Sequence, residues 1–178
     1  TKVLTEPRFP VDDFERVRQN RLVGLRTAEQ DPGSVGKKAL YRAVFGEHPY
    51  ATDPSGTADS VAALTRDDVT AFHATYYTAK NATLAIVGAL TRAQAQVLGN
   101  RITARLPAGK AAPPLPAVEE LSAGRLEQID FPSSQTHLYV GQPGMRRGDP
   151  DYFPLYIGNH ILGGSGLVSI LMHEVREK

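Results

Sequence analysis

The sequence predicts an α+β fold, because segments with helical spacing occur together with short strand-like runs. Four segments place apolar residues at helical spacing: 14–25, 34–45, 65–76 and 91–106. Three short apolar runs are typical of strands: 81–90, 125–131 and 135–142. A chain of 178 residues allows one full domain or two partial ones.

The first long helix is expected to begin after Phe9-Pro10, where Asp12 or Asp13 can cap its free N–H groups. Its apolar residues share one face, and Asp31-Pro32-Gly33 is expected to end it. Gly24 costs such a helix about 1 kcal/mol relative to alanine. This glycine therefore either has a packing reason or marks relaxed selection.

The next helices carry recognisable end signals. Gly46 is typical of the residue that follows a helix. Thr57 or Asp59 is expected to open a short helical turn. Thr65 predicts an N-cap, with Asp68 at the third helical position as in a capping box, and Thr91 predicts a further cap.

The composition changes after residue 106. Residues 107–124 contain four prolines and two glycines, which predicts an extended, semi-rigid linker. Two strands are expected beyond it, Arg125–Phe131 and Gln135–Gln142. A last helix is expected from Tyr152, interrupted at residues 163–166 and resumed from Leu167 to the end.

The composition excludes several classes of function. The net charge is +1 with scattered basic residues, which gives no nucleic-acid footprint. The absence of cysteine excludes disulfides, thiol catalysis and cysteine metal sites. No run of 18 apolar residues occurs, so no membrane-spanning helix is expected. Hydrophobic residues make up 41% of the chain, which predicts a core of ordinary size, and both ends are expected to be cuts in a longer protein.

Five segments, taken in order, resemble one family of enzymes: FERVRQNRLVGLRTAEQDP (14–32), FGEHPYATDPSG (45–56), LTRDDVTAFHATYY (64–77), NATLAIVGAL (81–90) and LGGSGLVSILMHEVREK (162–178). The sequence is similar to the pitrilysin/insulinase zinc peptidases, which include mitochondrial processing peptidase. The resemblance implies a fragment of their two-domain fold, with helices packed on an antiparallel-type mixed sheet. It assigns residues 1–106 to the C-terminal part of a first peptidase-like domain, 107–124 to a linker, and 125–178 to the N-terminal part of a second.

The resemblance also predicts that the zinc chemistry is missing. A catalytic zinc needs three protein ligands and an open position for water. In active members a glutamate of the first segment is the third ligand, and here it falls on Gly24, or on Val23 with a one-residue slip. The motif HxxEH, which supplies the other ligands and the general base, does not occur. The five histidines lie at 48, 73, 137, 160 and 173, and no two are three or four residues apart.

Other motifs favour structure over chemistry. Gly163-Gly164-Ser165-Gly166 lacks the lysine and the preceding strand of a phosphate loop. It is either a helix–helix turn or, as the resemblance implies, a loop that contacts peptide. His48-Pro49-Tyr50 matches a turn of the family and is interpreted as structural. Ser133 and Ser134 lack the G-x-S-x-G elbow of a serine hydrolase, although His137 lies close in sequence.

The sequence therefore predicts a non-catalytic member that assists an active, HxxEH-bearing sister subunit or domain and binds unfolded peptide. In some bacterial two-subunit members of the family, the non-catalytic chain contributes an arginine and a tyrosine to the active site of its partner. The resemblance implies that these two positions would lie beyond Lys178. Two alternatives stay open: a fragment of an active zinc metalloendopeptidase, and a structural subunit like the core proteins of the respiratory bc1 complex. The resemblance implies no cofactor in this chain, zinc in the active members, and the bacterial periplasm as the favoured compartment.

Overall fold

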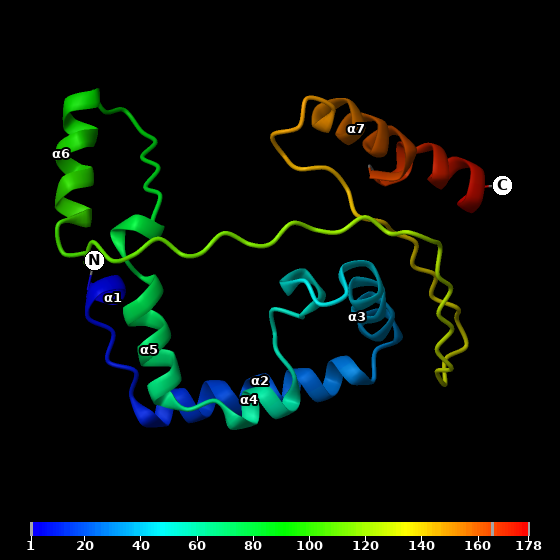
Figure 1. The fold of residues 1–178 in the computed structure, drawn as a ribbon, viewed down its shortest axis with the longest axis horizontal. Helices are drawn as coiled ribbons and strands as arrows, with labels where there is room; N and C mark the ends of the chain where they lie inside the picture. The colour runs from blue at the N-terminus through cyan, green and yellow to red at the C-terminus, as the bar shows by residue number, and fades with distance from the viewer. Residues whose placement is uncertain (1, 165, 178) are drawn as a thin grey trace. The chain divides into compact units, whose positions relative to one another are not determined.

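The computed structural model describes residues 2–164 and 166–177, and its regular structure is helical (Figure 1). The α-helices are α1 (Lys2–Thr5), α2 (Val11–Glu29), α3 (Pro32–Phe45), α4 (Ala58–Ala63), α5 (Arg66–Tyr76), α6 (Arg92–Thr103) and α7 (Tyr152–Asn159). The short 3-10 helices are η1 (Pro49–Ala51), η2 (Ala79–Asn81) and η4 (Gly166–Val168). Two π-helical turns are η3 (His160–Gly164) and η5 (Met172–Arg176).

The prediction of an α+β fold with helices packed on a mixed sheet is wrong, because no strand forms within 2–164 and 166–177. Residues 82–87, 125–131 and 136–140 lie outside helices and turns. A strand exists only where its N–H and C=O groups pair with a neighbouring strand. In the described part of the chain no ladder of backbone hydrogen bonds joins these segments, so the apolar runs remain unpaired.

Side-chain caps explain where several helices begin. Thr65 and Thr91 cap α5 and α6, as the sequence predicts. Thr65 forms the expected capping box with Asp68, and Thr91 forms a further one with Gln94. Asp31 caps α3 by accepting a hydrogen bond from the Ser34 N–H at 2.7 Å. The predicted cap of α2 is wrong. That helix begins at Val11 after Pro10, and Asp12 and Asp13 lie in its first turn, where their charge favours the positive end of the helix dipole.

The helices pack in local pairs. Helix α2 contacts α4 and α3, and α3 contacts η1. The Arg18 guanidinium joins the first pair by donating to the carbonyl oxygen of Ala62 at 3.0 Å and to that of Leu64 at 3.3 Å. These contacts join α2, α3, η1 and α4 into one packed group.

The expected core of ordinary size does not form. Among the described residues, only Leu25 and Val44 are buried hydrophobic side chains. The chain exposes 14836 Å², whereas a folded monomer of this mass exposes about 8,500 Å². Most apolar helix faces and all three extended segments are therefore open to solvent.

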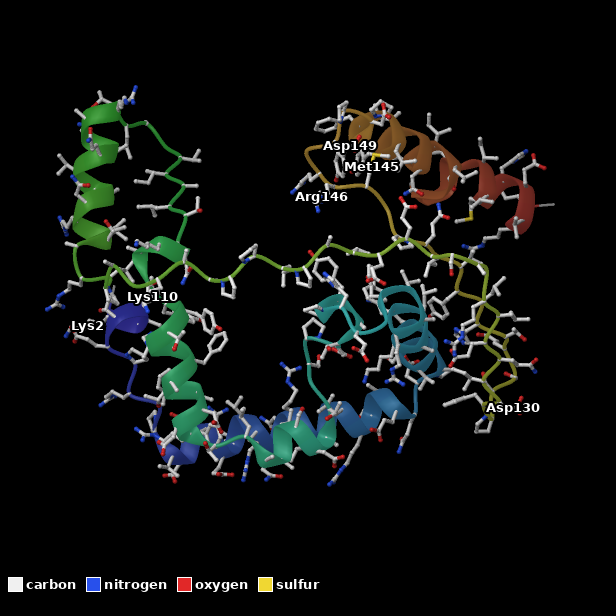
Figure 2. The ribbon with its side chains drawn as sticks, in the orientation of Figure 1. Lys2, Lys110, Asp130, Met145, Arg146 and Asp149 are labelled. Carbon is white, nitrogen blue, oxygen red and sulfur yellow. The ribbon has the colours of Figure 1, made fainter. Side chains whose placement is uncertain are left out.

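The chain divides into two compact units. The first comprises Thr1–Val118 and Gly124–Val140, and the second comprises Glu119–Ala123 and Gly141–Lys178. In the second unit, just before α7, the Asp149 side chain accepts a hydrogen bond from the Asp151 N–H at 2.9 Å. Figure 2 labels Asp149. No helix in the described ranges is long and apolar enough to cross a membrane.

Candidate functional site

Helix α2 carries the position at which the resemblance expects a zinc ligand. Gly24 lies within the helix, and a Cβ built on it would meet no atom within 4 Å beyond its own helix. The described residues therefore give no packing reason for this glycine. Val23, the alternative position, is 61% exposed. A larger residue would fit at position 24, and its assignment as the missing ligand position stays a prediction.

The donor set near α2 does not fit zinc. Residues one turn before and after Gly24 on the same face are Asn20 and Ala28, which are poor or impossible zinc ligands. Over residues 2–164 and 166–177, no three histidine, aspartate or glutamate side chains gather closely enough to hold a metal ion. We derive no catalytic step through a metal in this chain.

The described glycines of the glycine-rich segment lie in helical turns of the second unit, Gly163 and Gly164 at the end of η3 and Gly166 at the start of η4. A Cβ on Gly163 would lie 3.0 Å from Leu171 Cδ1, and one on Gly164 would lie 3.3 Å from the Asn159 carbonyl oxygen. Gly166 adopts a φ of +41°. Ser165 lies outside the described residues. Close packing and a positive φ explain these glycines structurally, and a peptide contact by this segment stays a prediction.

A groove lies in the first unit between α3 and the extended segments around residues 125–139. Its volume is about 190 Å³. Apolar side chains form most of its wall: Val35, Ala39, Leu40, Ala43, Leu126, Ile129, Phe131 and Leu138. Asp130 lies beside the turn that joins the two extended segments (Figure 2). The groove therefore combines an apolar helix face with two lengths of unpaired main chain.

One tyrosine fastens an extended segment to α3. The Tyr139 hydroxyl donates a hydrogen bond to the Gly33 carbonyl oxygen at 3.0 Å. A Cβ on Gly36 would approach the Tyr139 ring to 2.7 Å, so a glycine is needed for this close contact. No local sequence pattern marks Tyr139 or Gly36, because their contact joins residues more than 100 positions apart.

Helix α3, whose residues line the groove, begins at the acidic cap Asp31. Hydrogen bonds from Ser34, first its hydroxyl and then its N–H, hold the pKa of Asp31 below its ordinary value. The positive form of His137, which lines the groove, adds a smaller lowering. Asp31 is therefore an ionised cap at neutral pH. No serine lines the groove.

Comparisons with known proteins agree with the resemblance. An uncharacterized zinc protease of Streptomyces coelicolor is 29% identical over 99% of this chain and 39% of its own length. One of Mycobacterium leprae is 30% identical over 98% of this chain and 40% of its own length. The crystal structure of a peptidase M16 inactive domain from Pseudomonas fluorescens is 37% identical, with a TM-score of 0.88 over 99% of this chain and 42% of that one.

These matches confirm the resemblance to the pitrilysin-type zinc peptidases. The chain spans about two fifths of the length of the curated relatives that it matches. The profile of the family described as Peptidase M16 inactive domain matches residues 63–178, well over half of the chain. The chain therefore belongs to the Peptidase M16 inactive domain family.

Proposed function

We propose that this chain is the non-catalytic part of a zinc peptidase system and that it binds unfolded peptide for an active, HxxEH-bearing sister subunit or domain. The zinc and the general base would come from that partner. The observation that supports peptide binding is the groove beside α3, where two extended segments leave their main-chain groups unpaired. An extended peptide can pair with such groups and place alternate side chains against an apolar wall.

The exposed side chains of these segments fit that role. Leu126 is 90% exposed and Val140 is 86% exposed, so both are available to an incoming chain. Main-chain pairing requires no particular sequence, which suits the recognition of unfolded peptides. We further propose that the glycine-rich segment offers a second contact at Gly166, where space is open.

A peptidase assay with zinc quantification tests the non-catalytic role. The full-length protein is measured alone and mixed with its HxxEH-bearing partner. We expect it to be zinc-free and inactive alone, and the mixture to cleave peptides. Stoichiometric zinc and cleavage by the protein alone would favour the alternative, a piece of an active enzyme, which the names of the relatives as zinc proteases also favour.

Two proline substitutions test the peptide site. Val140→Pro removes a main-chain N–H beside the groove, and we expect it to weaken binding of a labelled unfolded peptide. Val87→Pro is the matched control, because Val87 is also a highly exposed valine in an extended segment but lies away from the groove lining. Equal affinities for the two variants would remove the groove from the proposal.

A further inference from the structure

The start of the linker is bound to η2 through its main chain. The N–H groups of Ala79 and Lys80 donate to the carbonyl oxygens of Pro107 and Ala108, at 2.8 and 3.2 Å respectively. The residues at 107–112 are nevertheless exposed. This stretch therefore presents its side chains to solvent while its main chain is held by the first unit.

The Asn81 side chain adds two hydrogen bonds, one on each side of Ala111. Its amide donates to the Lys110 carbonyl oxygen at 3.1 Å, and its carbonyl oxygen accepts from the Ala112 N–H at 2.7 Å. The same amide also donates to the Thr78 hydroxyl at 3.1 Å, which ties the side chain to the first unit. We call Asn81 with its two linker contacts the Asn81 clasp.

A glycine allows the linker to come this close. Gly109 adopts a φ of +62°, a backbone conformation that side-chain-bearing residues rarely adopt. A Cβ on Gly109 would collide with the Thr78 side chain. Thr78 is 2% exposed and so has no free space to move into. The backbone conformation and the close approach both require glycine at this position.

The clasp holds the main-chain groups around one bond that a peptidase could cut. Lys110 is the only lysine or arginine in residues 107–124, and it lies on the extended chain that follows α6 (Figure 2). An endopeptidase that cuts after lysine adds water across the Lys110–Ala111 bond, which leaves a carboxylate on Lys110 and an amine on Ala111. In acyl transfer, the carbonyl oxygen of the cleaved bond must enter an oxyanion hole. That oxygen is the one that Asn81 binds.

We propose that the Lys110–Ala111 bond is a latent cleavage site for endopeptidases that cut after lysine, and that the Asn81 clasp keeps it closed. Exposed segments of small residues are preferred sites of proteolytic nicking. A peptide that binds as an added strand uses its own N–H and C=O groups, and the clasp already occupies two of them. Cleavage therefore requires the clasp to open, and its rate follows the population of the open form.

A cut at this bond would fall inside the first unit. It would separate helix α3 from the extended segments that form the opposite wall of the groove. The hydrogen bond from the Tyr139 hydroxyl to Gly33 would then be one of the contacts that keep these segments on α3. Protection of the bond does not depend on whether the groove binds peptide.

Limited digestion of the full-length protein with trypsin measures access to the bond. Mass spectrometry gives the rate of cleavage between Lys110 and Ala111. Asn81→Ala removes both contacts with the linker, and we expect cleavage to become about fivefold to thirtyfold faster because two hydrogen bonds are lost. Asn100→Ala is the matched control. Asn100 is an exposed asparagine of α6 whose side chain forms no hydrogen bond among the described contacts, so the rate should not change.

A second pair of variants opens the clasp from the linker side. Gly109→Ala leaves Asn81 intact but places a methyl group against the buried Thr78 side chain, and we expect an acceleration of similar size. Gly124→Ala is its control, because a Cβ on this glycine would meet nothing within 4 Å. This pair decides the question if Asn81→Ala does not fold.

The results separate a local clasp from a general loss of stability. Faster cleavage after Lys110 in Asn81→Ala and Gly109→Ala, with both controls and the α2 site Arg16 unchanged, supports the proposal. Unchanged rates in both variants, or no cleavage after Lys110 in any protein, overturn it. An equal acceleration at Arg16 would show that the whole unit unfolds, and it would overturn a local clasp as well.

Amide exchange of the unsubstituted full-length protein gives an independent measure. The Ala112 N–H is bound by Asn81, so it should exchange at least about fivefold more slowly than that of an alanine in an unstructured chain. Exchange at the unstructured rate would mean that the clasp is open in solution, and it would overturn the proposal without any substitution.

Discussion

Helix α5 and the extended segment at residues 82–87 differ in the hydrogen bonding of their main-chain N–H and C=O groups. Thr65 caps the start of α5 through a capping box, and at its other end the Tyr77 N–H donates to the His73 carbonyl oxygen. Residues 82–87 make no such local bonds with one another among the described contacts. A helix completes its hydrogen bonds within a few residues, whereas a strand requires a partner that can be remote in sequence.

The largest expected effect contrasts a buried side chain of the helical region with an exposed one of the extended segment. Leu25 of α2 is 4% exposed and Val87 is 97% exposed. We expect Leu25→Ala to lower the free energy of unfolding by about 2–5 kcal/mol, because it removes packed methyl groups. Val87→Ala should change it by less than about 0.5 kcal/mol.

Denaturant unfolding followed by helical circular dichroism measures both variants. The comparison can also be repeated in the full-length protein. A large cost of Val87→Ala there would mean that residues 82–87 are covered by another part of that protein, and a negligible cost would mean that they stay exposed. Equal costs in the 178-residue chain would contradict the difference between the two regions.

Two glycines give a second contrast, between a helix face that is covered and one that is open. A Cβ on Gly36 of α3 would lie 2.7 Å from the Tyr139 ring, while one on Gly24 of α2 would meet nothing within 4 Å. We expect Gly36→Ala to destabilise the protein, since overpacking costs about 1–3 kcal/mol and outweighs the gain in helix propensity. Gly24→Ala should stabilise it by about 1 kcal/mol.

Thermal unfolding of the two alanine variants measures these effects, and amide exchange over residues 136–140 reports whether Tyr139 leaves α3. A stabilised Gly36→Ala with unchanged exchange would mean that Tyr139 does not pack against the helix. A destabilised Gly24→Ala would mean that α2 has a neighbour at this position that the described residues do not supply.

The local part of the fold could be predicted from the sequence, and the non-local part could not. The Thr65 and Thr91 caps and the end of α3 at Gly46 depend on residues a few positions apart. The sheet was predicted from apolar runs that favour strands. That prediction failed because a strand depends on partners, and none pairs with these runs in the described chain.

The candidate site also has a local part that the sequence could predict and a non-local part that it could not. The resemblance places Gly24 and the glycine-rich segment by matching short stretches of sequence. The groove depends on Tyr139 reaching Gly33, a contact across 106 positions. The hydrogen bond between the His48 ring and the Pro116 carbonyl oxygen spans 68 positions. Neither contact leaves a periodic or motif-like signal, so both required the structure.

Removal of one cap tests how far α5 depends on its own ends. In Thr65→Ala the Asp68 N–H loses its acceptor, and we expect a loss of about 1 kcal/mol. Thr65→Ser is the control, since serine also caps well. Chemical shifts of the first turn of α5 measure the fraying. An unchanged helix start in the alanine variant would mean that tertiary contacts, and not the capping box, fix it.

Acid should produce the smallest effect, and it should act on the capped helix α3 but not on the extended segment at residues 82–87. The hydrogen bonds from Ser34 keep the pKa of Asp31 below its ordinary value, so this ionised cap stabilises α3 above the pKa of the unfolded chain. That contribution is lost as the pH falls through the lower pKa of the folded state. We expect the first turn of α3 to fray below about pH 4. Asp31→Asn, which caps without titrating, should remove this pH dependence, as followed by amide chemical shifts of residues 32–36. Residues 82–87 contain no carboxylate and should show no corresponding change. A matching acid transition in residues 82–87, or its survival in Asp31→Asn, would show that acid acts through global unfolding and not through the cap.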